Sequence, residues 1–162
     1  MWLKKISYCI ATSCYLGYFP VASGTAGTLG GVLIYILWWR FSQAFWLYAL
    51  LTLVLFLVGV YVSTFVEREC GEKDPGIVVI DEVVGFLVTM ALIPFTWYWL
   101  LIGFTLNRIL DIMKPFPANW AQNHLKEGWG IMLDDVISSF YAHIILRLCL
   151  LVLNTIEKSI IT

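Results

Sequence analysis

The chain has 162 residues and a formal net charge of −1; apolar residues make up 60% of it, charged residues only 13%, and its mean hydropathy is +0.85. A water-soluble domain carries about a quarter charged residues, so this composition excludes an ordinary soluble protein and predicts an integral membrane protein. The balanced charge and the absence of a basic run in the sequence exclude a nucleic-acid-binding protein.

The N-terminal part is predicted to lie at the membrane surface before a first helix enters the bilayer. Residues 3–16 show an amphipathic pattern typical of an interfacial helix, with Trp2, Lys4 and Lys5 as its anchors. The glycine- and hydroxyl-rich stretch 23–28 (SGTAGT) then opens a helix. Its backbone N–H groups and hydroxyls suit an anion such as phosphate, although the same residue types also form ordinary helix caps.

Three apolar runs of different length follow. The run 29–39 is about 17 Å long, too short for a bilayer core of about 30 Å, and we expect it to pack against the first part of 44–66, which is long enough to cross the membrane. The hydrophilic stretch 67–76 is predicted to be a surface loop. Apolar residues resume over 77–106, where Pro94 interrupts the run and predicts a break.

The C-terminal third combines a polar segment with a last apolar helix, expected over 136–153. The predicted fold is therefore all-α: a compact integral-membrane helical bundle with short or broken helices and a polar site at one membrane face. We expect residues 1–162 to form a single membrane-embedded domain. Its parts are an interfacial N-terminal segment (1–22), a site-bearing core (23–139) and a C-terminal membrane helix (140–162).

Two pairs of adjacent carboxylates stand in or beside apolar runs, Asp81–Glu82 and Asp134–Asp135. One ionised carboxylate in hydrocarbon costs about 2.5–3.5 kcal/mol, and a pair repels itself unless a cation or a shared proton neutralises it. Acids favoured by a helix dipole would explain one pair, but two pairs favour a shared cation. Oxygen ligands in this number suit a hard divalent ion, Mg²⁺ before a transition metal.

Small residues follow each carboxylate pair at helical spacing, which allows two membrane helices to approach closely. We therefore expect the two pairs to face one another across a helix contact. The small residues are Gly85 and Thr89 after the first pair, and Ser138, Ser139 and Ala142 after the second.

A further polar cluster precedes Pro115, which is expected to end a helix near Lys114. Arg108 and Asp111 are three residues apart and share a helix face, so a structural ion pair would explain them. Lys114 stands at the helix end, where it could reach a phosphate as a point charge. A phosphate site and a structural ion pair both remain open at this stage.

Together these motifs resemble the phosphatidylglycerophosphatase A family of bacterial membrane lipid phosphatases. They occur in the family's order and span most of the chain; one departure is Ser138-Ser139, where the family often has Ala-Gly. The resemblance implies an enzyme of glycerophospholipid biosynthesis that uses Mg²⁺ to remove the terminal phosphate of phosphatidylglycerophosphate, leaving phosphatidylglycerol. The matching stretches are SGTAGTLGG (23–31), DPGIVVIDEVVGFLVT (74–89), RILDIMKPFP (108–117) and GWGIMLDDVISS (128–139).

The resemblance also implies the site residues, the partner and the location. The residues that match the family's acidic motifs, and that we expect to be catalytic, are Asp81, Glu82, Asp111, Asp134 and Asp135. All of these except Asp111 are expected to hold the metal, and which carboxylate acts as base stays open. The residues expected to bind the substrate phosphate are Thr25, Thr28, Arg108 and Lys114. The expected partner is a phospholipid in the bilayer, no nucleic acid is expected, and the oligomeric state stays open. The protein is expected to be a multi-pass protein of the bacterial inner (cytoplasmic) membrane. Its active site is expected on the cytoplasmic face.

One active site built from all four stretches requires them to lie at one membrane face. We therefore predict a hairpin near Pro94, with arms of about a dozen residues and roughly 18 Å each, covered by protein. Four simple spans would instead divide the lysines and arginines five against four between the two sides, which determines no orientation. A small transporter or ion-pathway protein is the alternative, because intramembrane carboxylates serve such proteins too; a membrane scaffold would explain the small residues but not the paired acids.

Overall fold

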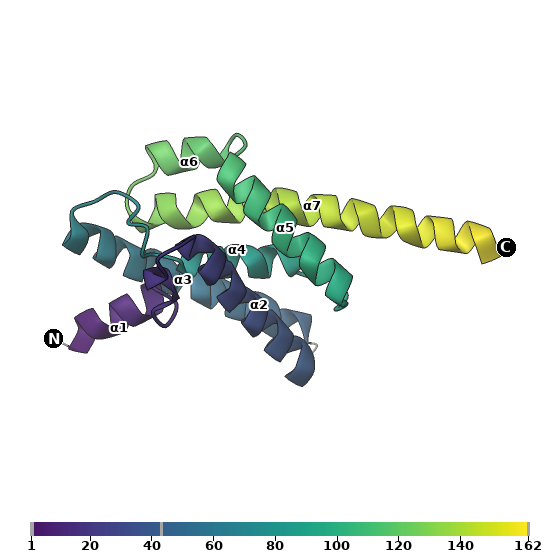
Figure 1. The fold of residues 1–162 in the computed structure, drawn as a ribbon, viewed down its shortest axis with the longest axis horizontal. Coiled ribbons are helices and arrows are strands. Elements are labelled where there is room, and N and C mark those ends of the chain that lie inside the picture. The colour runs from purple at the N-terminus through teal and green to yellow at the C-terminus, as the bar shows by residue number, and fades with distance from the viewer. Residues whose placement is uncertain (1, 43, 162) are drawn as a thin grey trace.

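The computed structural model describes residues 2–42 and 44–161, with side chains through residue 156 and at Ser159. This part of the chain forms seven α-helices, one short 3-10 helix and no strand, which confirms the all-α prediction (Figure 1). The elements are α1 (Trp2–Ala11), η1 (Leu16–Tyr18), α2 (Ser23–Phe41), α3 (Phe45–Cys70), α4 (Ile80–Met90), α5 (Trp97–Met113), α6 (Ala118–His124) and α7 (Gly128–Ile161).

The short helix α4 lies at the centre of the bundle and packs against α2, α3, α5 and α7. Its side chains Val84, Phe86 and Leu87 are completely buried. Glycine lets α2 approach it closely, because a Cβ at Gly31 would lie only 3.0 Å from the Cβ of Phe86 and from the carbonyl oxygen of Val83. The residues that begin α4, including its carboxylates, are therefore enclosed by helices on several sides.

The break expected at Pro94 is confirmed. Helix α4 ends at Met90, and α5 begins at Trp97, where the Thr96 hydroxyl accepts a hydrogen bond from the Trp99 N–H at 3.3 Å and caps the helix. With 11 residues, α4 is about 16 Å long, roughly half of a bilayer core. The chain therefore turns inside the bundle, and α5 leads it back toward the level at which α4 began.

Two tyrosines satisfy backbone carbonyls that this hairpin leaves without helical partners. The hydroxyl of Tyr48 on α3 donates to the carbonyl of Leu87 at 2.6 Å, and that of Tyr35 on α2 donates to the carbonyl of Ile93 at 2.8 Å. Both rings are buried. Non-helical backbone at membrane depth is stable only where protein covers it and supplies such partners, so these two side chains make the turn possible.

The hairpin places all four sequence motifs at one end of the molecule, here called the motif end: the end that holds the first turns of α2, α4 and α7 and the last turns of α3 and α5. The loop before α4 touches α6 there, since Gln122 donates to the Asp74 carboxylate at 3.0 Å and Lys73 reaches the carbonyl of Asn123 at 3.4 Å. The common face required by one active site is therefore present.

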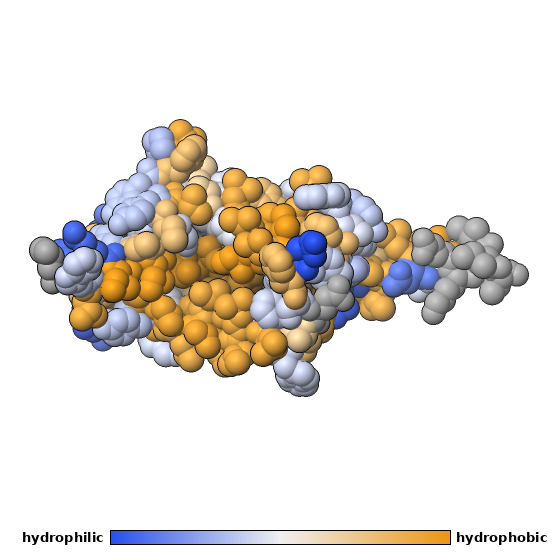
Figure 2. All heavy atoms as spheres, turned by 90° about the horizontal axis from the view of Figure 1, so that it is seen from below, coloured by the Kyte–Doolittle hydropathy of each residue, from blue (hydrophilic) through white to orange (hydrophobic). Residues whose placement is uncertain are grey.

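Two helices are long and apolar enough to cross a membrane, α3 and residues Gly128–Ile156 of α7, with mean hydropathies of 2.4 and 2.1. Much of the molecular surface is correspondingly apolar, and hydrophobic residues cover the middle of the face shown in Figure 2. Exposed side chains on α3 include Leu50, Leu53 and Leu57. An apolar surface of this kind is typical of a face that contacts lipid or another protein rather than water.

Two boundaries near the N-terminal half differ from the sequence-based expectation. The helix expected over 3–16 ends at Ala11, because the Thr12 hydroxyl accepts from the Tyr15 N–H at 3.1 Å and the chain turns into η1. The stretch 67–76, expected to be a loop, begins as four more residues of α3. That helix stops only at Gly71, whose left-handed backbone (φ 68°) forms its cap.

The last helix begins earlier than the expected 136–153. It starts at Gly128, whose N–H donates to the Thr64 hydroxyl at 3.1 Å and whose missing side chain lets α7 lie against α3. The second carboxylate pair therefore sits inside a helix rather than at its entry, and the expected boundary at 140 falls within α7. The short run 29–39 meets α3 near their connection, where the rings of Trp38 and Tyr48 are 5.7 Å apart, but along its length α2 packs on α4 instead.

The shared motif end is testable by cysteine labelling in a background that lacks the native cysteines. Single cysteines at Glu72 and Asn119, both exposed, are expected to react with a membrane-impermeant maleimide from the same side of sealed vesicles. A cysteine at Trp97, the first residue of α5 after the hairpin turn, is expected to stay unlabelled from that side. Labelling of positions 72 and 119 from opposite sides would contradict the fold.

Candidate functional site

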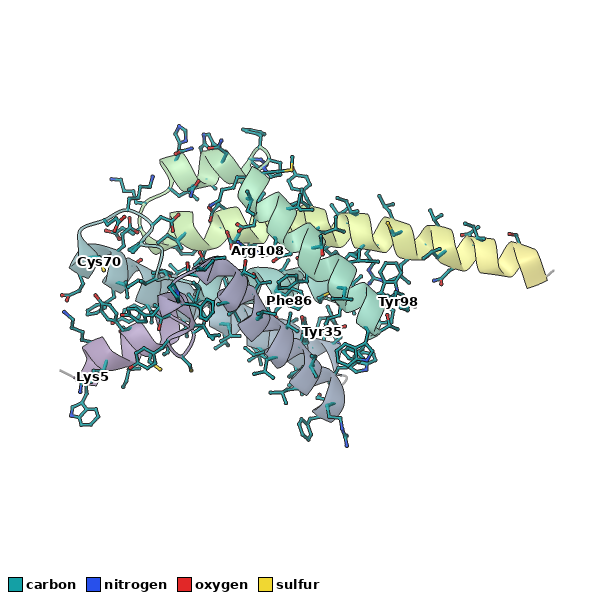
Figure 3. All side chains as sticks on the ribbon, viewed as in Figure 1. Lys5, Tyr35, Cys70, Phe86, Tyr98 and Arg108 are labelled. Carbon is teal, nitrogen blue, oxygen red and sulfur yellow. The ribbon has the colours of Figure 1, made fainter. Side chains whose placement is uncertain are left out.

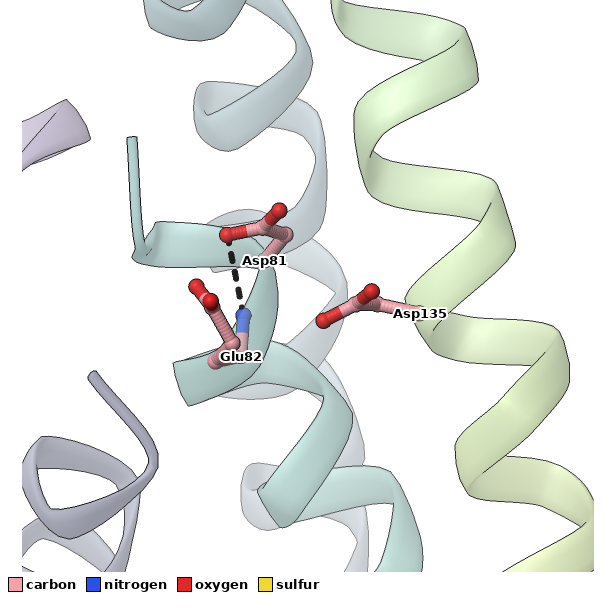
Figure 4. A group of neighbouring side chains, drawn as sticks. All are labelled: Asp81, Glu82 and Asp135. Atoms are coloured by element: carbon pink, nitrogen blue, oxygen red, sulfur yellow. Dashed lines mark hydrogen bonds between the residues drawn. The ribbon is translucent and has the colours of Figure 1, made fainter. Parts of the chain in front are cut away.

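A cluster of three carboxylates lies where the first turn of α4 faces α7. Asp81, Glu82 and Asp135 each place a carboxylate oxygen within 4.8 Å of the others (Figure 4). Asp81 and Asp135 are only 7% and 5% exposed. The Asp81 carboxylate accepts a hydrogen bond from the Glu82 N–H at 3.1 Å, and among the described residues none of the three acids forms an ion pair.

The donor set of this cluster fits a hard divalent cation. All of its ligands are carboxylate oxygens, the type that Mg²⁺ and Ca²⁺ prefer. One oxygen, Oε2 of Glu82, is buried and has no hydrogen-bond partner among the described residues. A buried carboxylate oxygen without a partner is costly, so a cation would supply the missing interaction.

Helix α2 closes the cluster on another side through two glycines. A Cβ at Gly24 would clash with Oε1 of Glu82 and lie 3.0 Å from Nη2 of Arg108, and one at Gly27 would lie 3.3 Å from Oε2 of Glu82. The glycine-rich first turns of α2 are therefore the surface on which Glu82 and Arg108 rest. Any side chain at these two positions would displace them.

Arg108 links α5 to α2 beside the carboxylates (Figure 3). Its Nη1 lies 2.9 Å from Oδ2 of Asp111, which is the ion pair predicted from their spacing, and donates to the Thr28 hydroxyl at 3.4 Å. Its Nε is buried without a partner among the described residues. Thr25 lies one turn before Thr28, in the first turn of α2.

Asp134, the other carboxylate of the α7 pair, has a different neighbour from Asp135. Asp134, 1% exposed, forms an ion pair with Lys114, which ends α5 in a left-handed conformation (φ 42°). Burial lowers the pKa of Lys114, but the nearby charges of Asp134, Asp135 and Asp111 raise it by more, so that its pKa lies above the usual lysine value. Lys114 is therefore a permanent cation at the edge of the cluster.

The structure thus brings the predicted acids and both predicted cations into one region at the motif end, but not into one ligand sphere. Three of the four expected metal ligands share a sphere, whereas the carboxylate of Asp134 points to Lys114. Five carboxylates, counting Asp111, face two cations. When all five are ionised, three negative charges are in excess, and in a buried site they must be balanced by a further cation or by bound protons.

One polar residue of this region was not singled out from the sequence. Asn107 on α5 is 2% exposed and donates to the hydroxyls of Ser139 on α7, at 2.7 Å, and of Thr89 on α4, at 3.1 Å. It ties together the three helices that carry the acids, about one turn below them. Its only signal in the sequence is its place one turn before Asp111 in an apolar segment.

The fold and the site define the class of the protein: an α-helical, membrane-associated protein with a buried acidic centre beside an arginine and a lysine. The family model described as phosphatidylglycerophosphatase A matches residues 9–150. The chain therefore belongs to the phosphatidylglycerophosphatase A family, and it is a lipid phosphatase, a phosphoric monoester hydrolase, as the motifs predicted.

Individual relatives agree with this assignment over most of their length. A phosphatidylglycerophosphatase A of Haemophilus influenzae is 35% identical over 149 residues, covering 88% of this chain and 91% of its own. One of Escherichia coli is 33% identical over 124 residues, covering 75% and 70%. A protein of Bacteroides thetaiotaomicron named as a putative phosphatidylinositol-3-phosphatase is 35% identical over 143 residues, covering 85% and 89%. No solved structure matches the chain.

The role of Asn107 predicts a specific loss of stability. In the Asn107→Leu variant the buried hydroxyls of Thr89 and Ser139 lose their shared donor, which is expected to cost about 1–2 kcal/mol. Thermal unfolding in detergent is expected to show a lower midpoint. Asn154→Leu, the same change at an exposed position of α7, should unfold like the wild type; equal midpoints for both variants would contradict the role of Asn107.

Proposed function

We propose that the protein hydrolyses the terminal phosphate monoester of phosphatidylglycerophosphate, giving phosphatidylglycerol and inorganic phosphate, with Mg²⁺ as its cofactor. The observation that carries this proposal is the three-carboxylate sphere with its unpartnered Glu82 oxygen, placed beside Arg108. Asp81, Glu82 and Asp135 would hold the metal. Asp134, expected from the sequence to be a fourth ligand, would instead position Lys114.

Three residues around the cluster would hold the phosphoryl group, and a fourth would position one of them. A phosphate monoester is dianionic, so its oxygens need several positive or hydrogen-bonding partners. Arg108 offers a guanidinium whose Nε has no other described partner, and Lys114 offers a charge at the opposite edge. The hydroxyl of Thr25 and the first backbone N–H groups of α2 would complete the site. Thr28, whose hydroxyl donates to the Gly24 carbonyl at 2.9 Å and accepts from Arg108, would act by holding that guanidinium in place.

In the chemical step, a water oxygen forms a bond to phosphorus while the bond between phosphorus and the glycerol oxygen breaks. A carboxylate outside the metal sphere, Asp111 or Asp134, would take one proton from the attacking water, and the departing glycerol oxygen would receive a proton from that carboxyl group or from solvent. Arg108 and Lys114 would stabilise the negative charge on the transferring group. Bound Mg²⁺ supplies Lewis acidity and lowers the pKa of a coordinated water.

The distribution of positive charge supports a location on the cytoplasmic side of a bacterial inner membrane. The hairpin moves most lysines and arginines to the motif end, and positive residues favour the cytoplasmic side. We propose a multi-pass protein with its site on that face, and residues 1–162 acting as one domain. The seven positive residues at the motif end are Lys4, Lys5, Arg68, Lys73, Arg108, Lys114 and Lys126. Arg40 and position 158 lie toward the other end, and Arg147 lies within α7 between the two ends.

A second lipid substrate is a candidate because of the relative named as a putative phosphatidylinositol-3-phosphatase, which is as similar to this chain as the phosphatidylglycerophosphatases are. Both lipids present a phosphate monoester on a polar headgroup. The cluster and its two cations recognise that shared group, so the choice between the lipids falls to residues that contact the rest of the headgroup.

The proposed substrate and cofactor predict the outcome of a release assay. The purified protein is expected to liberate phosphate from phosphatidylglycerophosphate in mixed micelles with Mg²⁺, to stop after chelation, and to recover when Mg²⁺ is restored. Phosphatidylinositol 3-phosphate is expected to be cleaved at least about tenfold more slowly, equivalent to about 1.4 kcal/mol. Faster cleavage of the inositol lipid, or full activity in chelator, would overturn the substrate or the cofactor respectively.

Replacing single acids by their amides distinguishes the carboxylates of the proposed site from an ordinary surface carboxylate. Asp81→Asn and Asp134→Asn are each expected to lower the turnover of phosphatidylglycerophosphate at least about 100-fold, because a ligand or the partner of Lys114 is lost. Both variants should still insert and fold. The matched control is Glu72→Gln at an exposed carboxylate, which should retain activity. Near wild-type turnover in both aspartate variants would sink the proposed site.

A further inference from the structure

An open cavity walled mainly by lysine stems and tyrosine rings lies between α1 and the turn that follows it. Its volume is about 330 Å³, and its lining consists of two lysines and three tyrosines, none of which belongs to the carboxylate site. Lys4 and Lys5 come from α1, Tyr8 from the same helix, and Tyr15 and Tyr18 from the turn and η1.

We propose that this cavity binds the headgroup of an anionic phospholipid of the bilayer, separately from the lipid that is hydrolysed. The chemistry that would recognise it is a phosphodiester with a net negative charge. Ammonium groups attract such a charge, and tyrosine rings place a hydroxyl donor at the level of the lipid headgroups.

Three side chains that line the cavity are not engaged in ion pairs or side-chain hydrogen bonds among the described residues. Lys5 forms no ion pair among the described residues and lies over the Trp2 ring, 5.9 Å from its centroid. The hydroxyls of Tyr15 and Tyr18 make no hydrogen bond within the described chain, and their rings stack 6.0 Å apart. The residues that line the cavity therefore supply two tyrosine hydroxyls without a hydrogen-bond partner among the described residues and one ammonium that is in no ion pair there.

Lys4 and Tyr8 fix the cavity against the rest of the protein. The Lys4 ammonium pairs with Glu69 near the end of α3, and the hydroxyl of Tyr8 lies 3.6 Å from the sulfur of Cys70. Figure 3 shows Lys5 and Cys70 at the same end of the molecule. The wall of the cavity is thus held in place before a lipid arrives, which reduces the entropy cost of binding.

An unusual backbone conformation also shapes this cavity. Ser13, Cys14 and Tyr15 are three consecutive non-glycine residues in the left-handed region, with φ of 47°, 57° and 71°. Each costs about 1 kcal/mol relative to an ordinary conformation. This strained turn is what brings Tyr15 and Tyr18 back toward α1, and a ligand held there would offset part of its cost.

The surroundings place the cavity in contact with lipid. Trp2, Leu3 and Ile6 are 76%, 69% and 55% exposed on α1, and the aromatic side chains of the following turn are exposed too. An amphipathic helix with lysines beside such residues lies in the membrane interface. The occupant is therefore a bilayer lipid rather than a soluble anion.

Lipid selectivity can be measured without any catalytic readout. The full-length protein is placed in phosphatidylcholine nanodiscs, and Trp2 emission is obtained as the difference between the wild type and Trp2→Phe. Dibrominated phosphatidylserine is expected to quench Trp2 more strongly than dibrominated phosphatidylcholine at the same mole fraction. In Lys5→Gln the preference for phosphatidylserine should fall about fivefold, equivalent to about 1 kcal/mol for one lysine at an anionic surface.

Three further arms decide between a site and general electrostatics. The double variant Tyr15→Phe/Tyr18→Phe, which changes no charge, is expected to weaken the preference as well, whereas Lys126→Gln, the same charge change at an exposed lysine outside the cavity, should leave it intact. Equal quenching by both lipids in the wild type would overturn the proposal. So would an equal loss in Lys126→Gln, or displacement of the brominated lipid by inorganic phosphate alone.

Discussion

The structure depends on how it neutralises carboxylates inside an apolar bundle. Asp81, Glu82 and Asp135 share one sphere without a described cationic partner, and burial makes their mutual repulsion far stronger than it would be in water. Arg108 and Lys114 reach the edges of the cluster but pair with Asp111 and Asp134. A divalent cation in the sphere would neutralise this repulsion, and under the proposed function the same cation would act as the Lewis acid for phosphate ester hydrolysis.

This constraint explains the irregular architecture around α4. Under the proposed function the acids must lie where a lipid headgroup can reach them, yet α4 is also enclosed by helices on several sides. A half-length helix and a hairpin meet both demands, because they return α5 with Arg108 to the level of the carboxylates. The tyrosines of α2 and α3 then satisfy the carbonyls of Leu87 and Ile93 at the turn. The same hairpin therefore determines both the path of the chain and the arrangement of the charged residues at the candidate site.

Local patterns predicted the features that depend on neighbouring residues. The Arg108–Asp111 pair follows from helical spacing, and the break near Pro94 follows from the backbone chemistry of proline. Features made by distant segments were not accessible in this way. The start of α7 at Gly128 depends on Thr64 of α3, and the role of Asn107 depends on hydroxyls from two other helices. A glycine or an asparagine in isolation carries no signal for such contacts.

The division of the second carboxylate pair has a geometric cause. Consecutive residues of an α-helix point about 100° apart, so the short side chains of two neighbouring aspartates diverge. Asp135 therefore faces the carboxylates of α4, while Asp134 faces the end of α5 and meets Lys114. The longer side chain of Glu82 overcomes the same divergence on α4 and joins Asp81. The acid pair of α7 thus has two different partners: Asp135 joins the carboxylates of α4, and Asp134 pairs with Lys114, the residue that would bind the phosphate.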